Sequence, residues 1–314
     1  MGGGTSMKNT EKVYIGVDGG GTKTAIGVFD ERWQCLAGAV CPPLNYHFVG
    51  VDAALANLRQ GIEALNIPAE QIAAVGIGDP SLDDVSEGGA AYRFAGAVRE
   101  MLGVPVFIRS DAYMTLYALT QGKTPGVLVI SGTGAMAIAE DSLGGVSVAG
   151  GWGRLTGDEG SGYFIGLQAL RAACHAADGI ALPTALTEAA LRYFGVESPR
   201  ALIDVFYGEH EPDVAGFARI AAECAEAGDP QALEILCEAA RYLADYTSVL
   251  ICKSRADIVG VYGSVLCRNR IVRAEFEDLL KERHPGIDIT EPPISAQCAA
   301  AMYAKAALEK ERTV

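Results

Sequence analysis

Apolar positions along the chain follow two periods, one typical of short strands and one typical of amphipathic helices. Short apolar runs bounded by glycine or polar turns predict strands, and apolar residues three and four positions apart predict helices. The elements expected in the first part of the chain are strands at 13–18, 23–29 and 33–40, a helix at 51–65, a strand at 71–78, a helix at 88–102, a strand at 104–110 and a short helix ended by Gly122.

The same order of elements begins again near residue 126. The expected elements are strands at 126–131, 135–140 and 144–151, a helix-rich stretch at 161–254, a strand at 256–264, and helices at about 266–283 and 295–311. The period of this repeated order is much longer than that of a solenoid repeat, so the chain is predicted to contain two similarly built domains. The expected bounds are 12–121, completed by the helix at 295–311, and 122–294 with a helical insertion.

Composition and charge disfavour several classes of function. The chain has 314 residues, half of them apolar, and a formal net charge of −14. Such an acidic chain is poorly suited to nucleic acid, whose phosphates require a basic face. No apolar run approaches the length of a membrane span, and no signal-peptide pattern opens the chain. We therefore expect no nucleic-acid partner, no membrane insertion and a cytoplasmic location.

The turn in VDGGGTKT, residues 17–24, is the most informative stretch. Glycine in a hairpin turn can serve only to allow a positive φ, but that reason does not explain three glycines followed by threonine. A reduced form, SGTG, recurs at 131–134. Glycine-rich turns expose backbone N–H groups to an anion, so two such turns predict a polyphosphate site. Asp18, at a strand end, is suited to Mg²⁺ or its waters.

Three other phosphate-binding patterns match less well. QGKT at 121–124 resembles the end of a P-loop, but Tyr117 occupies the position of its first glycine. GTGAMA at 132–137 fits the dinucleotide fingerprint, yet the residues that follow predict a strand, and no acidic residue stands at the ribose position. GWGRLT at 151–156 lacks a third glycine. All three matches are weak.

Three motifs together carry a family resemblance. VDGGGTKT, ISGTGA and GGWGRLTGDEGSGYFIG resemble the sugar-kinase branch of the actin/hexokinase/Hsp70 superfamily. More narrowly, they resemble the N-acetylglucosamine kinase-like proteins of the BadF/BadG/BcrA/BcrD ATPase family, from about Val13 to about Ala306. The resemblance implies an α/β fold of two RNase H-like domains, as in the actin-like ATPases, with ATP bound across an interdomain cleft.

The resemblance also implies which residues bind ATP and Mg²⁺. Asp18 would hold Mg²⁺, through water. The nucleotide-binding positions correspond here to Gly19, Gly20, Gly21, Thr22, Lys23 and Thr24 in a first phosphate loop, Ser131, Gly132, Thr133 and Gly134 in a second, and Gly263 and Ser264 beside the nucleoside.

Two residues of the first domain are candidates for work on the sugar. Asp111 follows a strand at the start of a helix, where the local pattern alone allows an N-cap. The resemblance makes it the general base that takes the proton of the attacking sugar hydroxyl. Asn45 could simply stabilise its proline-rich loop, whereas the family has an Asn-containing loop here that binds sugar hydroxyls.

The block GGWGRLTGDEGSG supplies further candidates for the acceptor site. Asp158 and Glu159 could merely favour the positive end of the next helix, which Ser161 could cap. The resemblance places Asp158 on the sugar and gives Glu159 less weight. Gly151 and Trp152 belong to the same block. Trp152 could support the sugar loop, but we expect it to fill core between the lobes.

Several positions depart from the family pattern. They are Ala135, where many relatives carry Ser, Asp79, Asp83 and Asp84, where relatives are usually small and apolar, and Tyr46-His47, which differ from the loop of the vertebrate enzymes. These departures bear on the identity of the sugar more than on the reaction.

The expected function is ATP-dependent phosphorylation of an amino sugar, N-acetylglucosamine to its 6-phosphate, by a homodimer. An alternative is an ATPase that activates a partner redox enzyme, as the dehydratase activators of the wider group do with a cysteine-held iron–sulfur cluster. The eight cysteines here form no C-x-x-C pair, and none flanks the glycine turns suitably. A sugar sensor without catalysis is disfavoured by the retained Asp18 and Asp111, and the zinc loop of the repressor/kinase group is absent.

Overall fold

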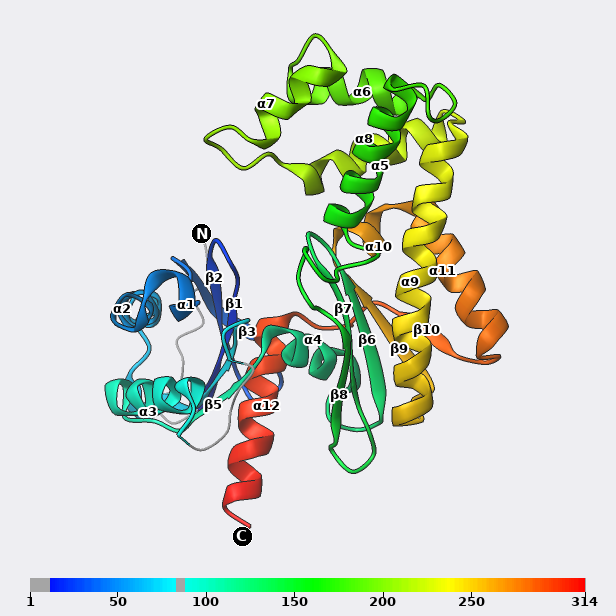
Figure 1. Ribbon diagram of the computed structural model, residues 1–314. Coiled ribbons are helices and arrows are strands. Elements are labelled where there is room, and N and C mark those ends of the chain that lie inside the picture. The colour runs from blue at the N-terminus through cyan, green and yellow to red at the C-terminus, as the bar shows by residue number, and fades with distance from the viewer. Residues whose placement is uncertain (1–11, 83–87, 314) are drawn as a thin grey trace, which may run out of the picture. The chain divides into compact units, whose positions relative to one another are not determined.

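The chain forms two compact units in the computed structural model, which describes residues 12–82 and 88–313. Unit 1 runs to Thr124 and resumes at Pro292, and unit 2 is Pro125–Glu291. Figure 1 follows the chain from blue to red through both units. Each unit contains one five-stranded sheet with helices. The predicted α/β class with two similarly built sheets is confirmed.

Unit 1 is built on a mixed sheet with strand order β3-β2-β1-β4-β5. Strand β1 is antiparallel to β2, and β1, β4 and β5 are parallel to one another. The elements of unit 1 are β1 (Val13–Gly19), β2 (Thr24–Phe29), β3 (Cys35–Cys41), α1 (Tyr46–Val49), α2 (Val51–Glu63), η1 (Ala69–Gln71), β4 (Ile72–Gly78), α3 (Ala90–Leu102), β5 (Val106–Arg109), α4 (Asp111–Thr120) and α12 (Ala296–Glu311).

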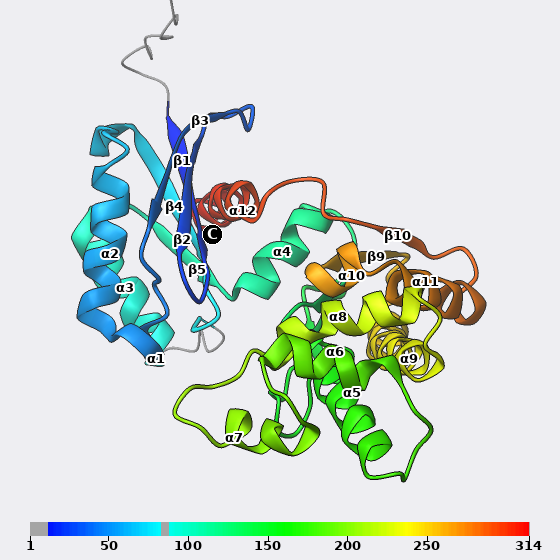
Figure 2. The ribbon, with the colours of Figure 1, turned by 90° about the horizontal axis from the view of Figure 1, so that it is seen from above.

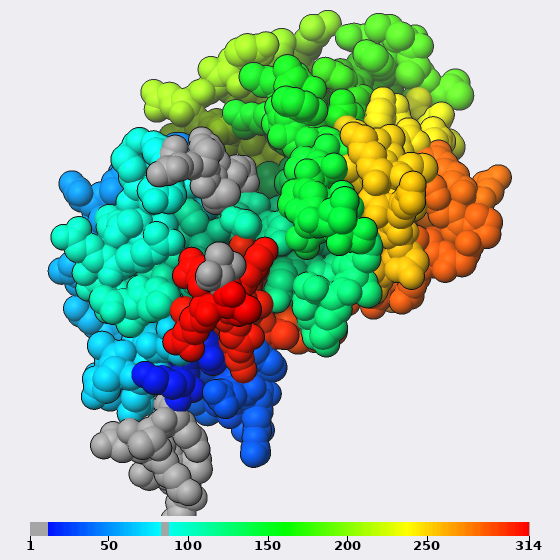
Figure 3. Space-filling view, turned by 90° about the horizontal axis from the view of Figure 1, so that it is seen from below, coloured from blue at the N-terminus to red at the C-terminus, as the bar shows by residue number. Residues whose placement is uncertain are grey.

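Helices cover both faces of this sheet, as Figure 2 shows, with α2 and α3 on one face and α12 on the other. Alternate strand residues such as Val17 and Ile77 enter a core that includes Leu58 of α2. On the opposite face, a side chain at Gly16 or Gly76 would overlap the backbone of α12. These two glycines therefore let α12 pack directly on the strands. The end of α12, red in Figure 3, reaches the surface.

Unit 2 repeats the strand pattern of unit 1, because its sheet has the order β10-β9-β6-β7-β8 with an antiparallel meander followed by two parallel strands. Its elements are β6 (Gly126–Ser131), β7 (Ala135–Glu140), β8 (Val146–Gly150), α5 (Gly162–Ala177), α6 (Ala185–Phe194), η2 (Pro199–Ala201), α7 (Leu202–Phe206), α8 (Val214–Glu226), α9 (Pro230–Ser254), β9 (Ile258–Tyr262), α10 (Ser264–Arg268), α11 (Arg270–Arg283) and β10 (Asp288–Thr290). Helices α5 to α8 gather beyond one end of the sheet in Figure 1.

The structure differs from the expected elements at short segments. The helix expected at about 266–283 is divided, because Asn269 leaves the helical backbone at a ψ of 104° and its side chain accepts hydrogen bonds from the backbone N–H groups of Ile271 and Val272. The helix expected to end at Gly122 ends at Thr120, since Gln121 adopts the left-handed conformation. Helix α1 and strand β10 are too short for periodicity to predict.

Candidate functional site

The turn between β6 and β7, residues 131–134, is held in place by the start of α5. The Gly162 amide donates to the Gly132 carbonyl at 2.7 Å, and the Tyr163 amide donates to the Thr133 carbonyl at 3.2 Å. The fully buried Ser131 hydroxyl donates to the Gly160 carbonyl at 2.7 Å. The two motifs that carried the family resemblance in this unit, ISGTGA and GDEGSGYFIG, therefore form one continuous structure.

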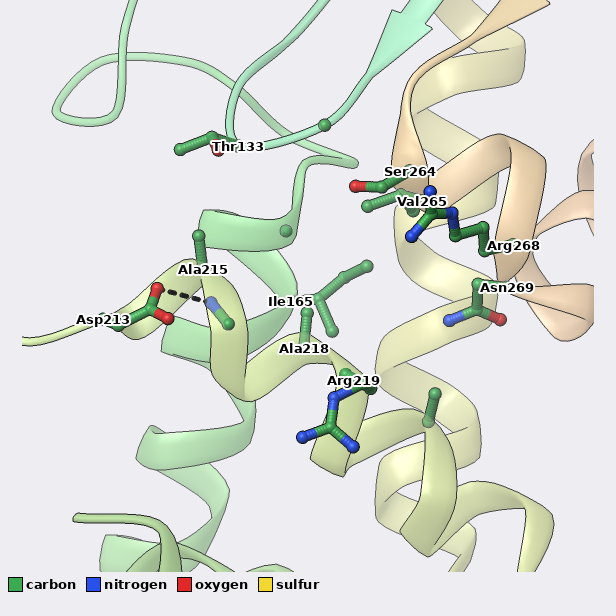
Figure 4. A pocket seen from close by; sticks show the side chains of 14 residues that line it. Thr133, Ile165, Asp213, Ala215, Ala218, Arg219, Ser264, Val265, Arg268 and Asn269 are labelled. Atoms are coloured by element: carbon green, nitrogen blue, oxygen red, sulfur yellow. Dashed lines mark hydrogen bonds between the residues drawn. The ribbon is translucent and has the colours of Figure 1, made fainter. Parts of the chain in front are cut away.

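A cavity of about 440 Å³ opens beside this turn, and it lies wholly within unit 2 (Figure 4). It brings the predicted residues Gly132, Thr133 and Ser264 together. The residues that line it are Gly132, Thr133, Gly162, Ile165, Asp213, Ala215, Gly216, Ala218, Arg219, Ala222, Ser264, Val265, Arg268 and Asn269. Apolar walls with a few convergent polar groups are typical of sites for small organic ligands.

The polar side chains of the cavity differ in how they are engaged. Asp213 is committed to the fold, because one carboxylate oxygen caps α8 by accepting from the Gly216 amide at 2.8 Å. Arg219 forms an ion pair with Glu223 at 2.6 Å. Arg268 extends into the cavity from α10, next to Ser264 (Figure 4). The contribution of α8 was not expected from the sequence, since this helix carries no recognisable motif.

Gly263 has a structural role beside the cavity rather than a place on its wall. Its φ is +93°, and a side chain there would overlap the Ser131 carbonyl and crowd the Gly132 amide. Glycine at this position thus lets the chain that enters α10 pass directly against the turn at 131–134. Ser264, the next residue, is the one that lines the cavity.

The two acidic residues of the GDEGSG block contact different neighbours. Asp158, at a φ of +62°, accepts a hydrogen bond from the Ala135 amide at 3.4 Å, directly after the turn at 131–134. Glu159 accepts a hydrogen bond from the Tyr246 hydroxyl. Burial, and then this bond to Glu159, raise the pKa of Tyr246. Ser161 is the N-cap of α5, as the sequence suggested, accepting from the Phe164 amide at 3.0 Å.

Trp152 does not pack into the core of unit 2, because its side chain is 77% exposed. The expectation that it fills core between the lobes stays a prediction. The neighbouring Gly151 has a φ of +74°, and its amide donates to the Ala135 carbonyl at 3.0 Å. The start of the block is therefore also hydrogen-bonded to Ala135, the residue directly after the turn at 131–134.

In unit 1, three carboxylates lie at one edge of the sheet. Asp18 is the penultimate residue of β1, Asp79 follows β4 and Asp111 follows β5. These strands are parallel neighbours, so their carboxyl ends meet at the same edge. Burial, and then the charge of Asp79, raise the pKa of Asp18. Burial also raises the pKa of Asp79, although hydrogen bonds from Ser81 oppose this shift.

The glycines of the first turn are not equivalent. Gly21 faces open space, whereas a side chain at Gly19 would overlap the Asp79 carboxylate. Thr22 and Lys23 are exposed. Thr24 is fully buried, and its hydroxyl lies beside the Cys41 thiol. The expectation that Thr24 offers a hydroxyl to a phosphate therefore does not fit its position, and the hydroxyl of Thr22 is the accessible one. Gly20 closes the turn, donating to the Lys23 carbonyl at 3.0 Å.

Asp111 is not the N-cap of α4. The cap is Ser110, whose hydroxyl accepts from the Tyr113 amide at 3.3 Å. Asp111 is the first residue of the helix, partly buried, and one of its oxygens accepts from the Ala112 amide at 2.8 Å. The alternative interpretation of this residue as the helix cap is therefore wrong, and its role as a base stays a prediction.

Asn45 is buried and caps the short helix α1, because its side-chain oxygen accepts from the His47 amide at 3.1 Å. Its role in stabilising the loop is thus observed.

Asp79 is part of the described structure, whereas Asp83 and Asp84 lie outside the described residues.

The residues at the edge of unit 1 fit a magnesium ion. Asp18 offers the oxygen donor that Mg²⁺ prefers, and the charge of Asp79 adds to the negative potential there. A bound cation would offset the cost that burial imposes on the charged form of Asp18.

Within residues 12–82 and 88–313, no helix is both long and apolar enough to cross a membrane.

Comparison with known proteins gives consistent results along the whole chain. A profile of the BadF/BadG/BcrA/BcrD ATPase family matches residues 15–304. The chain is 32% identical to N-acetyl-D-glucosamine kinase of Dictyostelium discoideum, over 94% of this chain and 98% of that protein. It is 27% identical to N-acetylmuramic acid/N-acetylglucosamine kinase of Clostridium acetobutylicum, over 88% and 93% of the two chains.

Solved structures share the fold. The structure of a candidate N-acetylglucosamine kinase from Chromobacterium violaceum has a TM-score of 0.70 at 26% identity, covering 93% of this chain and 99% of that one. A ROK family glucokinase from Streptomyces griseus, in complex with glucose and AMPPNP, has a TM-score of 0.58 at 20% identity, covering 94% and 99%. The second likeness concerns the fold alone.

Proposed function

The chain belongs to the BadF/BadG/BcrA/BcrD ATPase family, and from this premise we propose that it is an ATP-dependent sugar kinase that converts N-acetylglucosamine to its 6-phosphate. The observation that carries the proposal is the likeness to the Dictyostelium kinase, which extends over 94% of this chain. Both glycine turns, the GDEGSG block and Asp111 fall within residues 15–304, the stretch that the family profile matches.

The cavity of unit 2 supports the nucleotide half of this proposal. Its apolar wall, formed by residues such as Ile165 and Val265, suits the face of a purine ring. Gly132 and Thr133 line the same cavity at the turn, where backbone N–H groups and a hydroxyl can bind phosphate oxygens. We assign the nucleoside to the space between α8 and α10 and the phosphates to the turn.

The edge of unit 1 supports the acceptor half. We propose that Asp111 accepts the proton of the attacking sugar hydroxyl, because it follows β5 at the same edge of the sheet as Asp18. Phosphoryl transfer requires mostly positioning and charge neutralisation, with one acceptor near the hydroxyl. Asp18 would hold Mg²⁺, which when bound neutralises charge on the phosphate oxygens. Asn45 and Asp158 are proposed sugar contacts.

A coupled assay of ADP release over a panel of acceptors tests the function. The panel is N-acetylglucosamine, glucosamine, N-acetylmuramic acid, N-acetylmannosamine and glucose, and ³¹P NMR identifies the phosphorylated position. We expect N-acetylglucosamine to give the highest kcat/KM and a 6-phosphate product. Brisk ATP hydrolysis that no sugar stimulates, with an iron–sulfur cluster found by anaerobic iron analysis, would instead establish the activator alternative.

The homodimer and the cytoplasmic location expected from the sequence stay predictions. Light scattering coupled to size-exclusion chromatography tests the first, with a mass of twice 32.8 kDa as the expected result.

A further inference from the structure

We propose that Asp79 is a positioning residue that couples the acceptor loop of unit 1 to its phosphate turn. The acceptor loop is Asn45 with helix α1, and the phosphate turn of unit 1 is Gly19–Thr24. The inference rests on the proposed function, because it states how two binding elements of that function are joined. All the residues involved belong to unit 1.

The first connection runs from Asp79 to the phosphate turn. Asp79 follows β4 and is 1% exposed. Its carboxylate fills the space that a side chain at Gly19 would occupy, with the oxygen Oδ2 nearest to that position. Oδ2 is buried and accepts no hydrogen bond from the described residues. The contact is therefore one of close packing, in which the carboxyl group supports the backbone of the first glycine in the turn.

The second connection runs from Asp79 to the acceptor loop. The other carboxylate oxygen, Oδ1, accepts hydrogen bonds from the Ser81 amide at 2.9 Å and from the Ser81 hydroxyl at 2.6 Å. The Ser81 carbonyl in turn accepts from the Tyr46 hydroxyl at 2.8 Å. Tyr46 is the residue after Asn45, and its ring packs on Phe94 with centroids 5.6 Å apart. The acceptor loop is thus connected to Gly19 through Ser81 and the Asp79 carboxylate.

These contacts form a short chain from Asn45 to Gly19, in which Asp79 and Ser81 are buried and Tyr46 is partly buried. Packed interiors transmit displacement because they have little free volume. A ligand that orders the backbone at Gly19 would therefore also restrict the Asp79 carboxyl, and through Ser81 it would restrict Tyr46. Ordering the same residues once lowers the cost for a second ligand, which is positive coupling. By linkage, the acceptor sugar and the nucleotide must affect each other's affinity by the same factor.

The test is to measure the Kd of ADP by calorimetry with and without saturating N-acetylglucosamine, using the full chain. In the wild type we expect the sugar to strengthen ADP binding by about five-fold or more, the lower range of measured couplings. Tyr46→Phe, which removes only the hydroxyl that bonds Ser81, should bring this factor close to one. Asp79→Ala should do the same. The double variant should lose no more than either single one, because both break the same chain.

Two further variants separate coupling from simple damage. Asp79→Asn keeps the shape of the side chain and an oxygen that can accept from Ser81. It should therefore retain the wild-type ratio of the two Kd values, even where the lost charge beside Asp18 changes both of them. Tyr92→Phe removes a hydroxyl from an exposed tyrosine on α3 and should also retain it. Melting curves for all variants confirm that the fold is intact, and Tyr46→Phe keeps the test available if Asp79→Ala does not fold.

The outcomes are distinct. If the wild type binds both ligands with a factor of one, or if Tyr46→Phe and Asp79→Ala keep the wild-type factor, the coupling proposal is wrong and the kinase proposal stands. If the wild type binds neither ADP nor any sugar of the panel, both proposals are wrong.

Discussion

Gly132 and Gly263 stand beside each other at the phosphate turn of unit 2, and the structure predicts opposite results for the same substitution at the two positions. A Cβ atom built on Gly132 meets no atom within 4 Å, and Gly132 lines the cavity. A Cβ atom on Gly263 would overlap the Ser131 carbonyl, at a φ of +93° that side chains rarely adopt. We therefore expect Gly132→Ala to affect the ligand and Gly263→Ala to affect the fold.

The size of the first effect follows from the proposed phosphate contacts. A methyl group at Gly132 would hold the phosphate away from the turn, and a hydrogen bond to a charged group contributes about 1.5–3 kcal/mol. Loss of one such bond predicts ADP binding weaker by about 10- to 150-fold. Because the added carbon occupies open space, the melting temperature should stay at the wild-type value. Gly132→Val should weaken ADP binding further.

The size of the second effect follows from backbone strain. A residue forced into such a conformation costs about 1–3 kcal/mol, and about 2–4 °C of melting temperature is lost per kcal/mol in a unit of this size. Gly263→Ala should thus lower the melting temperature by several degrees. Calorimetric titration with ADP and scanning calorimetry measure the two quantities on the same samples. Unchanged ADP affinity in both Gly132→Ala and Gly132→Val would show that the turn is an ordinary hairpin.

Three other substitutions test the remaining roles. Asp111→Asn should lower kcat by about 100-fold or more, as expected for a lost general base, with ADP affinity unchanged; turnover within a few-fold of wild type would remove it from that role. Asp158→Ala should raise the sugar KM and lower kcat, and it should also weaken ADP binding slightly because Asp158 accepts from the Ala135 amide. Asp158→Asn keeps an acceptor and should leave the ADP affinity unchanged. Equal losses of ADP affinity in the two variants would contradict this role of the hydrogen bond. Burial and the charge of Asp79 raise the pKa of Asp18, so the ionised carboxylate lowers stability once the pH exceeds the unfolded pKa of about 3.9. Asp18→Asn should therefore raise the melting temperature more at pH 8 than at pH 4. An equal change at both pH values would show that the ionisation of Asp18 is not the cause.

Much of the proposed nucleotide site was predictable because local sequence determines it. The SGTG turn joins two strands whose apolar runs are unambiguous, and its glycines stand where a tight turn and an exposed backbone are both needed. The GDEGSG block is bonded to that turn through Gly160 and Gly162. The far wall of the cavity was not predictable. It comes from α8, an ordinary amphipathic helix of the insertion, whose Arg219 reaches the cavity only because of how α8 packs on α5.

The first glycine turn shows why a motif can be recognised correctly while one of its residues is explained by the wrong cause. From the sequence, Gly19 was one of three glycines that open a turn to phosphate. In the structure its missing side chain makes room for the Asp79 carboxylate, and only Gly21 faces open space. The two explanations predict the same residue, because each requires that no Cβ be present. They differ in which group requires the space: a phosphate in the first explanation and the Asp79 carboxylate in the second. Asp79 follows β4, a strand whose pairing with β1 the sequence alone does not give. Asp79 was noticed only as a departure from the family pattern. Its significance follows from the register of β1 and β4, in which Asp18 pairs with Gly78, so that the residues after each lie side by side.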